Sequence, residues 1–455
     1  MTRIRTVPQE LLAKYDRRVP RYTSYPTAPQ FAPKVRATDY RAWLGGLDPA
    51  LPLSLYFHIP FCDSLCWFCG CHTKVVRRYE PIAAYLELLL GEMDRVADLL
   101  PGRHRVCHVH LGGGTPTILE PADMERLFAR LRERFDLVPG ADVAVENDPR
   151  AFNRDLVETM ARVGVTRASL GLQDVDPQVQ RAVNRVQSMD ETRGVANALR
   201  GAGIASINID LMYGLPYQTV ARVLTTIEAV LDLGPERICL FGYAHVPWMK
   251  RHQRQIDVDA LPDAAERFAQ YMAAVTRLQE AGYAWIGLDH FARPDDALAR
   301  AARDKTLRRN FQGYTTDPAP VRLGFGPSAI GSLPQGFVQN QVPMHAYRDA
   351  LQAGGLPIAR GLRFDGDDRL RGAVIERLMC FLEVDLDEVC RGFGAHPGVF
   401  ADALSALAGM AADGVVALDG ARVRVTTRGR PFVRTVCAAF DRYLEPGETR
   451  HAQAV

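Results

Sequence analysis

Long apolar runs and blocks of like charge are both missing from this chain. None of its 455 residues belong to an apolar stretch near the ~20 residues that span a bilayer, and the first residues lack the apolar core of a secretory signal. Acidic and basic residues almost balance, at a formal net charge of +2, so there is no electrostatic case for nucleic acid or an anionic membrane as a partner. We therefore expect a soluble, cytoplasmic protein.

Cysteines are mostly scattered, which together with the missing signal disfavours a disulfide framework. Five of them are read as reduced core residues: Cys107, Cys239, Cys380, Cys390 and Cys437. The exception is a cluster in which Cys62, Cys66 and Cys69 follow the spacing C-x3-C-x2-C, with Cys71 two residues further on.

This cluster has the ligand chemistry of an iron–sulfur site. Three thiolates can each hold one iron of a [4Fe–4S] cube and leave the fourth iron open to a substrate or cofactor. A structural zinc ion is the alternative, because Cys71 or His72 could supply the fourth ligand that closes a tetrahedron.

From residue 53 onward, short apolar runs alternate with longer amphipathic segments, which is typical of βα units on a parallel sheet. The expected strands are Leu53–His58, Val106–Leu111, Asp142–Glu146, Arg167–Leu172, Ile207–Met212 and Ile238–Tyr243. The expected helices are Ile82–Leu99, Pro121–Phe135, Arg154–Val163, Asp190–Ala202 and Ala221–Leu233. Six units, with one further strand near Ala284–Leu288, predict an open, partial (β/α) barrel.

The motifs follow the carboxyl ends of these strands, where such folds carry their active sites, so we expect them to share one pocket. Residues 1–50, rich in proline and aromatics, predict an extended arm rather than a helix, and residues 51–364 form the catalytic barrel. Residues 365–455 predict a small, mostly helical domain, with helices Arg369–Phe381 and Val399–Asp413 before a hairpin turning at Asp419-Gly420. This end is winged-helix-like, but it lacks a basic groove for DNA.

The segment YFHIPFCDSLCWFCGC, residues 56–71, resembles the radical S-adenosylmethionine (SAM) superfamily, and within it the oxygen-independent coproporphyrinogen III oxidase branch. Further similar segments follow in order along the chain: RYTSYPTA, GGGTPT, ENDPR, GLQD, QRAVNR, NIDLMYGLP, YAHVP, DHFARPDD and NFQGYTT. The resemblance implies an α/β fold, a partial (β/α)6 TIM-like barrel of the radical SAM type.

The resemblance implies a [4Fe–4S] cluster held by Cys62, Cys66 and Cys69, and two molecules of SAM. Residues matching Tyr56 and Glu146 contact one SAM, on which Ile330 packs, and Gly113, Gly114 and Thr115 lie between the two. The second SAM contacts the remaining set: Phe68, Gln173, Arg185, Asp210 and Ala244. The missing Cβ atoms of Gly112–Gly114 suit a close approach of backbone to ligand.

The implied reaction is the anaerobic oxidative decarboxylation of two propionates of coproporphyrinogen III to vinyl groups, driven by SAM-derived 5′-deoxyadenosyl radicals. It gives protoporphyrinogen IX on the route to haem, in a monomer served by an unidentified reductant and electron acceptor. Cys71 either acts in catalysis or packs under the cluster, and Arg21 either anchors a propionate or packs with the arm.

Two other functions stay open. One is the related haem chaperone, which has the same cluster loop but binds haem without decarboxylating; Cys71 and the RYTSYPTA arm favour the enzyme. The other is a divergent radical SAM enzyme on another tetrapyrrole. Two positions depart from the branch pattern: Asn147, where an apolar residue is usual, and the terminal RHAQAV.

Overall fold

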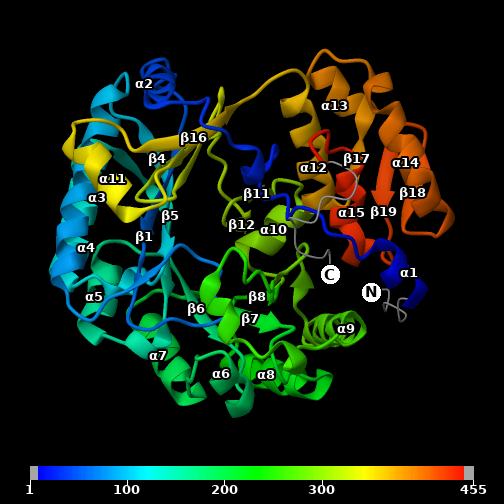
Figure 1. Cartoon of the computed structure of the whole chain (residues 1–455), viewed down its shortest axis with the longest axis horizontal. Helices are drawn as coiled ribbons and strands as arrows, with labels where there is room; N and C mark the ends of the chain where they lie inside the picture. The colour runs from blue at the N-terminus through cyan, green and yellow to red at the C-terminus, as the bar shows by residue number, and fades with distance from the viewer. Residues whose placement is uncertain (1–8, 445–455) are drawn as a thin grey trace.

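A twelve-stranded sheet forms the centre of the computed structural model, which describes residues 9–444 (Figure 1). Six of its strands follow one another side by side and in parallel: β1 (Leu53–Ile59), β4 (Arg105–Gly113), β5 (Asp136–Asn147), β6 (Arg167–Gln173), β7 (Ser206–Tyr213) and β8 (Arg237–Gly242). All six predicted strands are confirmed. Their parallel order means that every carboxyl end lies along the same edge.

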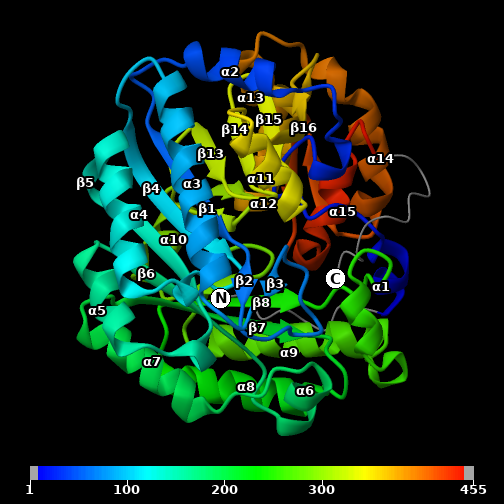
Figure 2. The same ribbon diagram turned by 60° about the vertical axis from the view of Figure 1, so that its left-hand side comes forward.

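Helices cover the outer face of these strands (Figure 2). They are α3 (Glu80–Leu99), α4 (Pro121–Arg134), α5 (Arg154–Arg162), α7 (Met189–Gly201) and α8 (Val220–Leu233). The short helix α6 (Pro177–Ala182) follows β6 and packs at the strand ends, where Val179 clusters with Leu215 and Tyr243. In α3 the buried residues Ile82, Leu86, Leu89 and Met93 recur every three or four positions, so one stripe of the helix packs on the sheet. The five predicted helices lie within two residues of these bounds, and the partial barrel is confirmed.

Further strands extend the sheet at both ends, but the two end strands do not pair with each other, so the barrel stays open. At one end β13 (Val321–Phe325) pairs in parallel with β1, and β14 (Ile330–Leu333), β15 (Gly336–Asn340) and β16 (Ile358–Arg363) continue antiparallel. At the other, β10 (His290–Ala292) pairs antiparallel with β8 and with β9 (Ala284–Trp285). The further strand expected near Ala284–Leu288 is therefore two short strands, and β13–β16 were not predicted.

The remaining elements of the barrel region are short, apart from one long helix. They are β2 (Phe61–Cys62), β3 (Lys74–Val75), α9 (Ala264–Glu280), α10 (Ala297–Arg303), β11 (Arg308–Asn310), β12 (Gly313–Thr315) and α11 (Met344–Gln352). The 3-10 helices of the chain are Ala28–Gln30, Pro116–Ile118, Pro149–Ala151, Arg251–Gln255, Val258–Ala260, Pro397–Phe400 and Arg430–Phe432.

The N-terminal arm crosses from the C-terminal region to the far end of the sheet (Figure 1). It contains α1 (Gln9–Tyr15) and α2 (Ala37–Gly45), so the prediction of an extended arm without helix is wrong at both ends and right only between them. Ala32 exchanges two backbone hydrogen bonds with Gly361, at 2.8 and 2.9 Å, and Thr435 donates its hydroxyl to the Tyr15 carbonyl at 2.8 Å. The arm thus ties the two parts together.

The C-terminal region packs helices around a small sheet. Its elements are α12 (Asp368–Phe381), β17 (Glu383–Asp385), α13 (Leu386–Gly392), α14 (Ala401–Ala412), β18 (Val416–Asp419), β19 (Arg422–Val425) and α15 (Val433–Ala438). The predicted hairpin is confirmed, but Asp419 pairs with Arg422, so Gly420 and Ala421 form the turn, one residue later than expected. The C-terminal segment RHAQAV, which departs from the branch pattern, lies outside the described residues.

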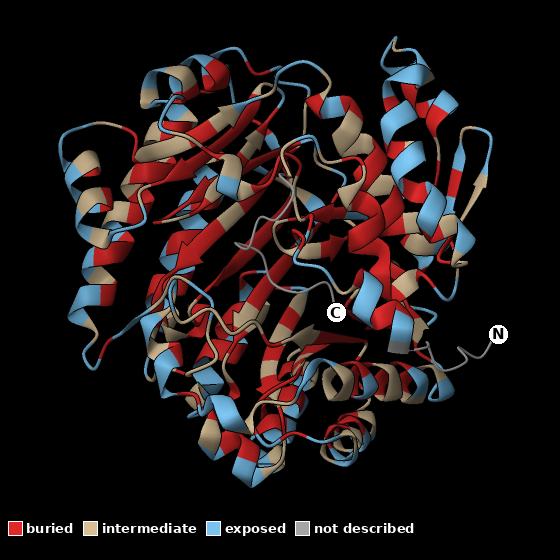
Figure 3. Cartoon of the chain, turned by 45° about the vertical axis from the view of Figure 1, so that its right-hand side comes forward, coloured by how far each residue is buried: buried red, intermediate tan, exposed pale blue. Residues whose placement is uncertain are grey.

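Burial follows the layers: the strands are mostly buried and the helices expose their outer faces (Figure 3). Among residues 9–444, no helix has the length and apolar character to cross a membrane. Glu92 of α3 is among the charged groups that are fully buried. Its carboxylate accepts hydrogen bonds from Gly326 N at 2.8 Å, Asn340 Nδ2 at 2.6 Å and the Tyr347 hydroxyl at 2.6 Å. Burial raises the pKa of Glu92 to about 7.

Candidate active site

The predicted motifs meet at the carboxyl ends of the parallel strands. The cysteine loop follows β1, Gly113 ends β4, and Glu146 and Gln173 lie at the ends of β5 and β6. Two cavities open there: a cysteine cavity of about 170 Å³, lined by the loop thiols, and a central cavity of about 450 Å³ inside the barrel. The expected convergence on one region is confirmed.

The cysteine loop is clamped between β2 and β3, which pair as two short parallel strands. Its backbone is held from several sides: Asn184 Nδ2 donates to Leu65 O at 2.8 Å, and His252 Nε2 lies 2.7 Å from Cys69 O. Lys250 Nζ donates to Cys71 O at 2.9 Å. The loop is therefore a fixed part of the fold.

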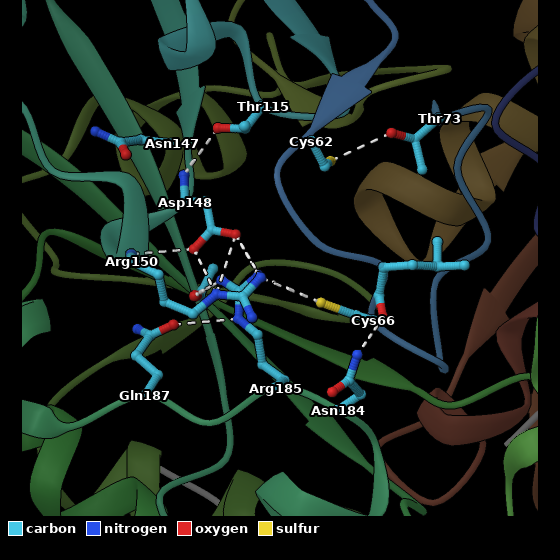
Figure 4. Close-up of polar contacts among 12 residues, drawn as sticks. Cys62, Cys66, Thr73, Thr115, Asn147, Asp148, Arg150, Asn184, Arg185 and Gln187 are labelled. Atoms are coloured by element: carbon cyan, nitrogen blue, oxygen red, sulfur yellow. Dashed lines mark hydrogen bonds and ion pairs between the residues drawn. The ribbon is translucent and has the colours of Figure 1, made fainter. Parts of the chain in front are cut away.

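Cationic groups face the Cys66 sulfur (Figure 4). Arg150 Nη2 lies 3.4 Å and Arg185 Nη1 3.6 Å from Cys66 Sγ, and both guanidinium groups bind Asp148 Oδ2, at 2.7 and 2.8 Å. Burial opposes the charge of Asp148, but Arg150 and Arg185 together hold its pKa below the ordinary value. This network places net positive charge next to the Cys66 sulfur, and such charge stabilises the thiolate form that binds a metal.

The other sulfurs also receive hydrogen bonds. Thr73 Oγ1 donates to Cys62 Sγ at 3.2 Å, and burial raises the pKa of Cys62 to about 11. Cys71 donates its backbone N–H to Cys69 Sγ at 3.4 Å, and its thiol helps to lower the pKa of Cys69 to about 7. Cys71 thus touches a predicted ligand while its own side chain stays exposed.

The glycine motif is required by the packing of the chain itself. A Cβ on Gly112 would lie 2.7 Å from Glu146 Oε1, one on Gly113 2.7 Å from the His58 ring, and one on Gly114 within 2.8 Å of the Phe61 backbone. Gly113 also has φ of 119°, a conformation open to glycine. Gly113 and Gly114 line the cysteine cavity, so the close packing leaves its wall free of side chains.

Glu146 is held at the boundary of both cavities. It accepts from Gly113 N at 3.1 Å, and His110 Nε2 lies 3.1 Å from its other oxygen. Burial opposes its charge, but the His110 contact keeps the pKa of Glu146 below the ordinary value. The carboxylate is therefore an ionised acceptor suited to hydroxyl or ammonium groups.

Asp210 and Gln173 supply further polar groups to both cavities. Asp210 accepts from the Ser169 hydroxyl at 2.9 Å and from Asn208 Nδ2 at 2.8 Å, and burial raises its pKa. Gln173 has φ of 74°, in the left-handed region that side chains rarely adopt, which is typical of residues fixed at functional sites.

The structure brings most of the predicted SAM residues together. The cysteine cavity contains Phe68, Gly113, Gly114, Glu146, Gln173, Arg185 and Asp210, and the central cavity adds Ala244. Arg21, the candidate propionate anchor, also lines the central cavity. Tyr56, Thr115 and Ile330 lie beside these walls. The Tyr56 hydroxyl is 2.9 Å from His58 Nδ1, Thr115 Oγ1 accepts from Asp148 N at 3.1 Å, and the Ile330 backbone packs on Gly324, the β13 neighbour of Tyr56.

Several lining residues were missed by the sequence analysis. Asp148 and Arg150 belong to the ENDPR segment, and their place after a strand end could have indicated a role. Asn147, read as a residue of the strand face, lines the cysteine cavity and accepts from the Thr117 hydroxyl at 3.3 Å. Cys239, read as a scattered core thiol, lines the central cavity, and nothing in its sequence context marks it.

These residues fit a [4Fe–4S] cluster. The three predicted ligand thiols line one cavity together with Cys71, and cations and hydrogen-bond donors face the ligand sulfurs. The glycine wall leaves the cavity open on another side. No three His, Cys, Asp or Glu side chains of residues 9–444 are grouped to hold a single metal ion. Ligands of a four-iron cube each bind a different iron, so they need not converge on one point.

Comparison with protein-family models defines the class. Residues 56–230, from β1 through α8, match the model described as Radical SAM superfamily, and residues 364–432 match the HemN C-terminal domain. The cysteine loop and the parallel strands are thus those of a radical SAM protein, with a [4Fe–4S] cluster and SAM as its cofactors.

Comparison with individual proteins defines the family. The chain is 52% identical over 440 residues to the oxygen-independent coproporphyrinogen III oxidase of Bradyrhizobium diazoefficiens, covering 97% of this chain and 98% of that one. It is 40% identical to the Pseudomonas aeruginosa protein of the same description, covering 96% and 95%. The solved structure of coproporphyrinogen III oxidase (HemN) from Escherichia coli, described as a radical SAM enzyme, superposes with a TM-score of 0.91 at 38% identity, covering 97% and 100%. The chain therefore belongs to the oxygen-independent coproporphyrinogen III oxidase family.

Proposed function

We propose that this protein converts two propionates of coproporphyrinogen III to vinyl groups in the absence of oxygen, giving protoporphyrinogen IX. The observation that carries the proposal is the 52% identity to a coproporphyrinogen III oxidase across 97% of the chain. The cavities add support, because the cysteine cavity and the larger central cavity share Glu146, Gln173 and Asp210.

We assign the cluster to Cys62, Cys66 and Cys69. When bound, the cluster and SAM supply a carbon radical able to take hydrogen from an unactivated carbon. Arg150 and Arg185 stabilise the thiolate of Cys66, while the N–H of Cys71 and the hydroxyl of Thr73 donate to the other two sulfurs. Such donors tune the electron affinity of a cluster.

We assign two SAM molecules to the polar residues around the cavities. Glu146 and Asp210 are half-buried acceptors for hydroxyl or ammonium groups, and Gln173 offers an amide. Arg185 already binds Asp148 and Gln187 Oε1, the latter at 3.1 Å, so its guanidinium is held in place before a ligand arrives. Gly113, Gly114 and Ala244 leave room beside these groups.

The substrate site of this proposal is the central cavity, with Arg21 as the arm residue that faces a propionate and Cys71 at its edge. The protein acts as a monomer with an external one-electron reductant and an electron acceptor. The division into an arm (1–50), a barrel (51–364) and a C-terminal domain (365–455) is part of the proposal, supported by the family match that begins at residue 364.

The test is an anaerobic assay with SAM, a reductant and coproporphyrinogen III, followed by mass analysis of the porphyrin. The product should be lighter by two formic acid equivalents and should form in step with 5′-deoxyadenosine. Haem binding without loss of CO2 under the same conditions would assign the chain to the haem chaperones instead.

A further inference from the structure

A third cavity, of about 270 Å³, lies where the barrel, the arm and the C-terminal region meet. Four arginines line it, and we call it the arginine cavity: Arg18 and Arg21 of the arm, Arg267 of α9 and Arg434 of α15. One carboxylate, that of Asp289, shares the lining, and it already contacts His290, with Oδ1 and Nδ1 2.8 Å apart. The cavity therefore carries excess positive charge.

The guanidinium of Arg267 packs against two glycines, at positions where a larger residue would collide with it. A Cβ on Gly214 would lie 2.9 Å from Arg267 Cζ, and a Cβ on Gly242 would lie 3.1 Å from Arg267 Nη2. These two glycines follow or end β7 and β8, so the guanidinium sits at the carboxyl ends of the strands, on the face that carries the active site. Its Nη1 donates to Tyr243 O at 2.9 Å, and Cζ lies 5.5 Å from the centre of the Tyr213 ring.

Arg267 is positioned by neutral groups and not by a carboxylate. Its Nη1 donates to a backbone carbonyl, and its Nε is buried without a hydrogen-bond partner. Arg434 is 3% exposed, donates Nε to Pro20 O at 2.9 Å, and has its pKa lowered to about 9 by burial and by the nearby charge of Arg21. An anion in the cavity would relieve this repulsion and supply the missing acceptor.

The arginine cavity adjoins the central cavity. Arg21, Gly242, Ala244 and Val246 line both, so a ligand in the barrel can extend a side arm between the arginines. The remaining walls include Tyr243, Trp248 and Leu288, which suit the apolar part of such an arm. The site thus selects a carboxylate carried on a short aliphatic chain.

We propose that the arginine cavity binds a propionate of coproporphyrinogen III that is not reacting, with Arg267 and Arg21 as its direct partners. The inference rests on the proposed function for the identity of the substrate. Arg434 acts as a positioning residue, because its guanidinium holds the arm through Pro20 and so fixes where Arg21 lies. The anchored carboxylate sets which propionate of the ring reaches the cysteine cavity.

Equilibrium binding tests this without turnover, using the anaerobic, cluster-loaded protein and no SAM. The probes are coproporphyrinogen III and its tetramethyl ester, which keeps the ring and loses the charges. Arg267→Gln should weaken binding of the acid at least about tenfold, the worth of one charge-assisted contact, and Arg267→Lys less. Arg21→Gln, at an exposed position of the arm, should act in the same direction, and the ester should bind wild type and both Gln variants equally weakly.

The matched control is Arg277→Gln, on the same helix but outside the cavity, where Arg277 pairs with Glu228 at 2.5 Å. Equal binding of the acid by Arg267→Gln and Arg277→Gln would overturn the proposal, as would an equal loss for acid and ester. A separate titration with SAM alone gives a further check: loss of one bound SAM equivalent in Arg267→Gln would overturn the proposal, because it would assign the arginines to that cofactor. If the wild-type protein binds the acid through Arg267 but releases no CO2 in the turnover assay, the proposed reaction is contradicted while the propionate site stands.

Discussion

Gly114→Ala is the substitution that probes most sharply how the barrel holds the cysteine loop. The added Cβ would lie 2.7 Å from the carbonyl carbon and 2.8 Å from the nitrogen of Phe61, and closer still to its oxygen. Phe61 begins β2, and its oxygen accepts from Thr115 N at 2.8 Å. Non-bonded carbon contacts need about 3.5 Å, so this backbone must move by about 1 Å, and Cys62 moves with it.

The cost follows from that displacement. Overpacking of this kind destabilises by about 1–3 kcal/mol. For 455 residues, an unfolding entropy of about 2 cal/mol/K per residue turns this into a Tm loss of only ~1–3 °C. The cluster is more sensitive, because one of its three thiolates shifts by a large part of an iron–sulfur bond length. We expect the variant to fold and yet to retain much less iron than wild type.

Gly70→Ala is the matched control. Gly70 lies on the cysteine loop itself, between two cysteines, and a Cβ there meets nothing within 4 Å. It should keep about four irons and four sulfides per chain after anaerobic reconstitution. Iron and sulfide analysis together with thermal unfolding decides the case. Equal iron in the two variants would refute the argument that the glycine wall fixes the loop.

Other predictions address the ligands, SAM and a buried acid. Cys66→Ala should lose the cluster, whereas Cys71→Ala should keep most of its iron; equal loss in iron analysis would make Cys71 a ligand. Arg185→Ala should weaken one SAM equivalent more than the other in anaerobic equilibrium binding, and one unaffected site would contradict the two-SAM assignment. The folded-state pKa of Glu92 is raised from 4.5 to about 7, so charging it penalises the fold as pH rises through this range. Glu92→Gln should therefore gain about 3 kcal/mol relative to wild type between pH 4 and pH 8 in denaturant unfolding, and a constant difference would contradict the shift.

The sequence predicted the parallel core well, because its signal is local. Apolar runs such as Val106–Leu111 and the stripe of α3 carry their own periodicity, and turn residues separate them. Placement of the motifs at strand ends then predicted the shared site. The strands β13–β16 escaped prediction because they are short and pair with neighbours far along the chain, as β13 does with β1.

Long-range contacts also explain the other misses. The helices α1 and α2 form where the arm packs on distant elements. The proline-rich stretch between them indicates extended chain, and extending that reading to the whole arm hid the two helices. Asp148 lies two residues from Glu146, but only the fold brings it beside Arg185 and Cys66. The arm is also structural: Arg309 donates to Tyr22 O at 3.2 Å and the Tyr22 hydroxyl to Asp441 at 3.1 Å. Point substitution of Arg21 is therefore a cleaner test of its role than deletion of the arm.

The central claim is that the cofactors held at the cysteine loop act on a substrate propionate. Coproporphyrinogen III deuterated at the propionate β-carbons tests it most directly, in anaerobic turnover with SAM and reductant. 5′-Deoxyadenosine should gain deuterium as vinyl groups form, and Cys66→Ala should produce neither the deuterated nucleoside nor the vinyl product. Vinyl product accompanied by deuterium-free 5′-deoxyadenosine would contradict the central claim.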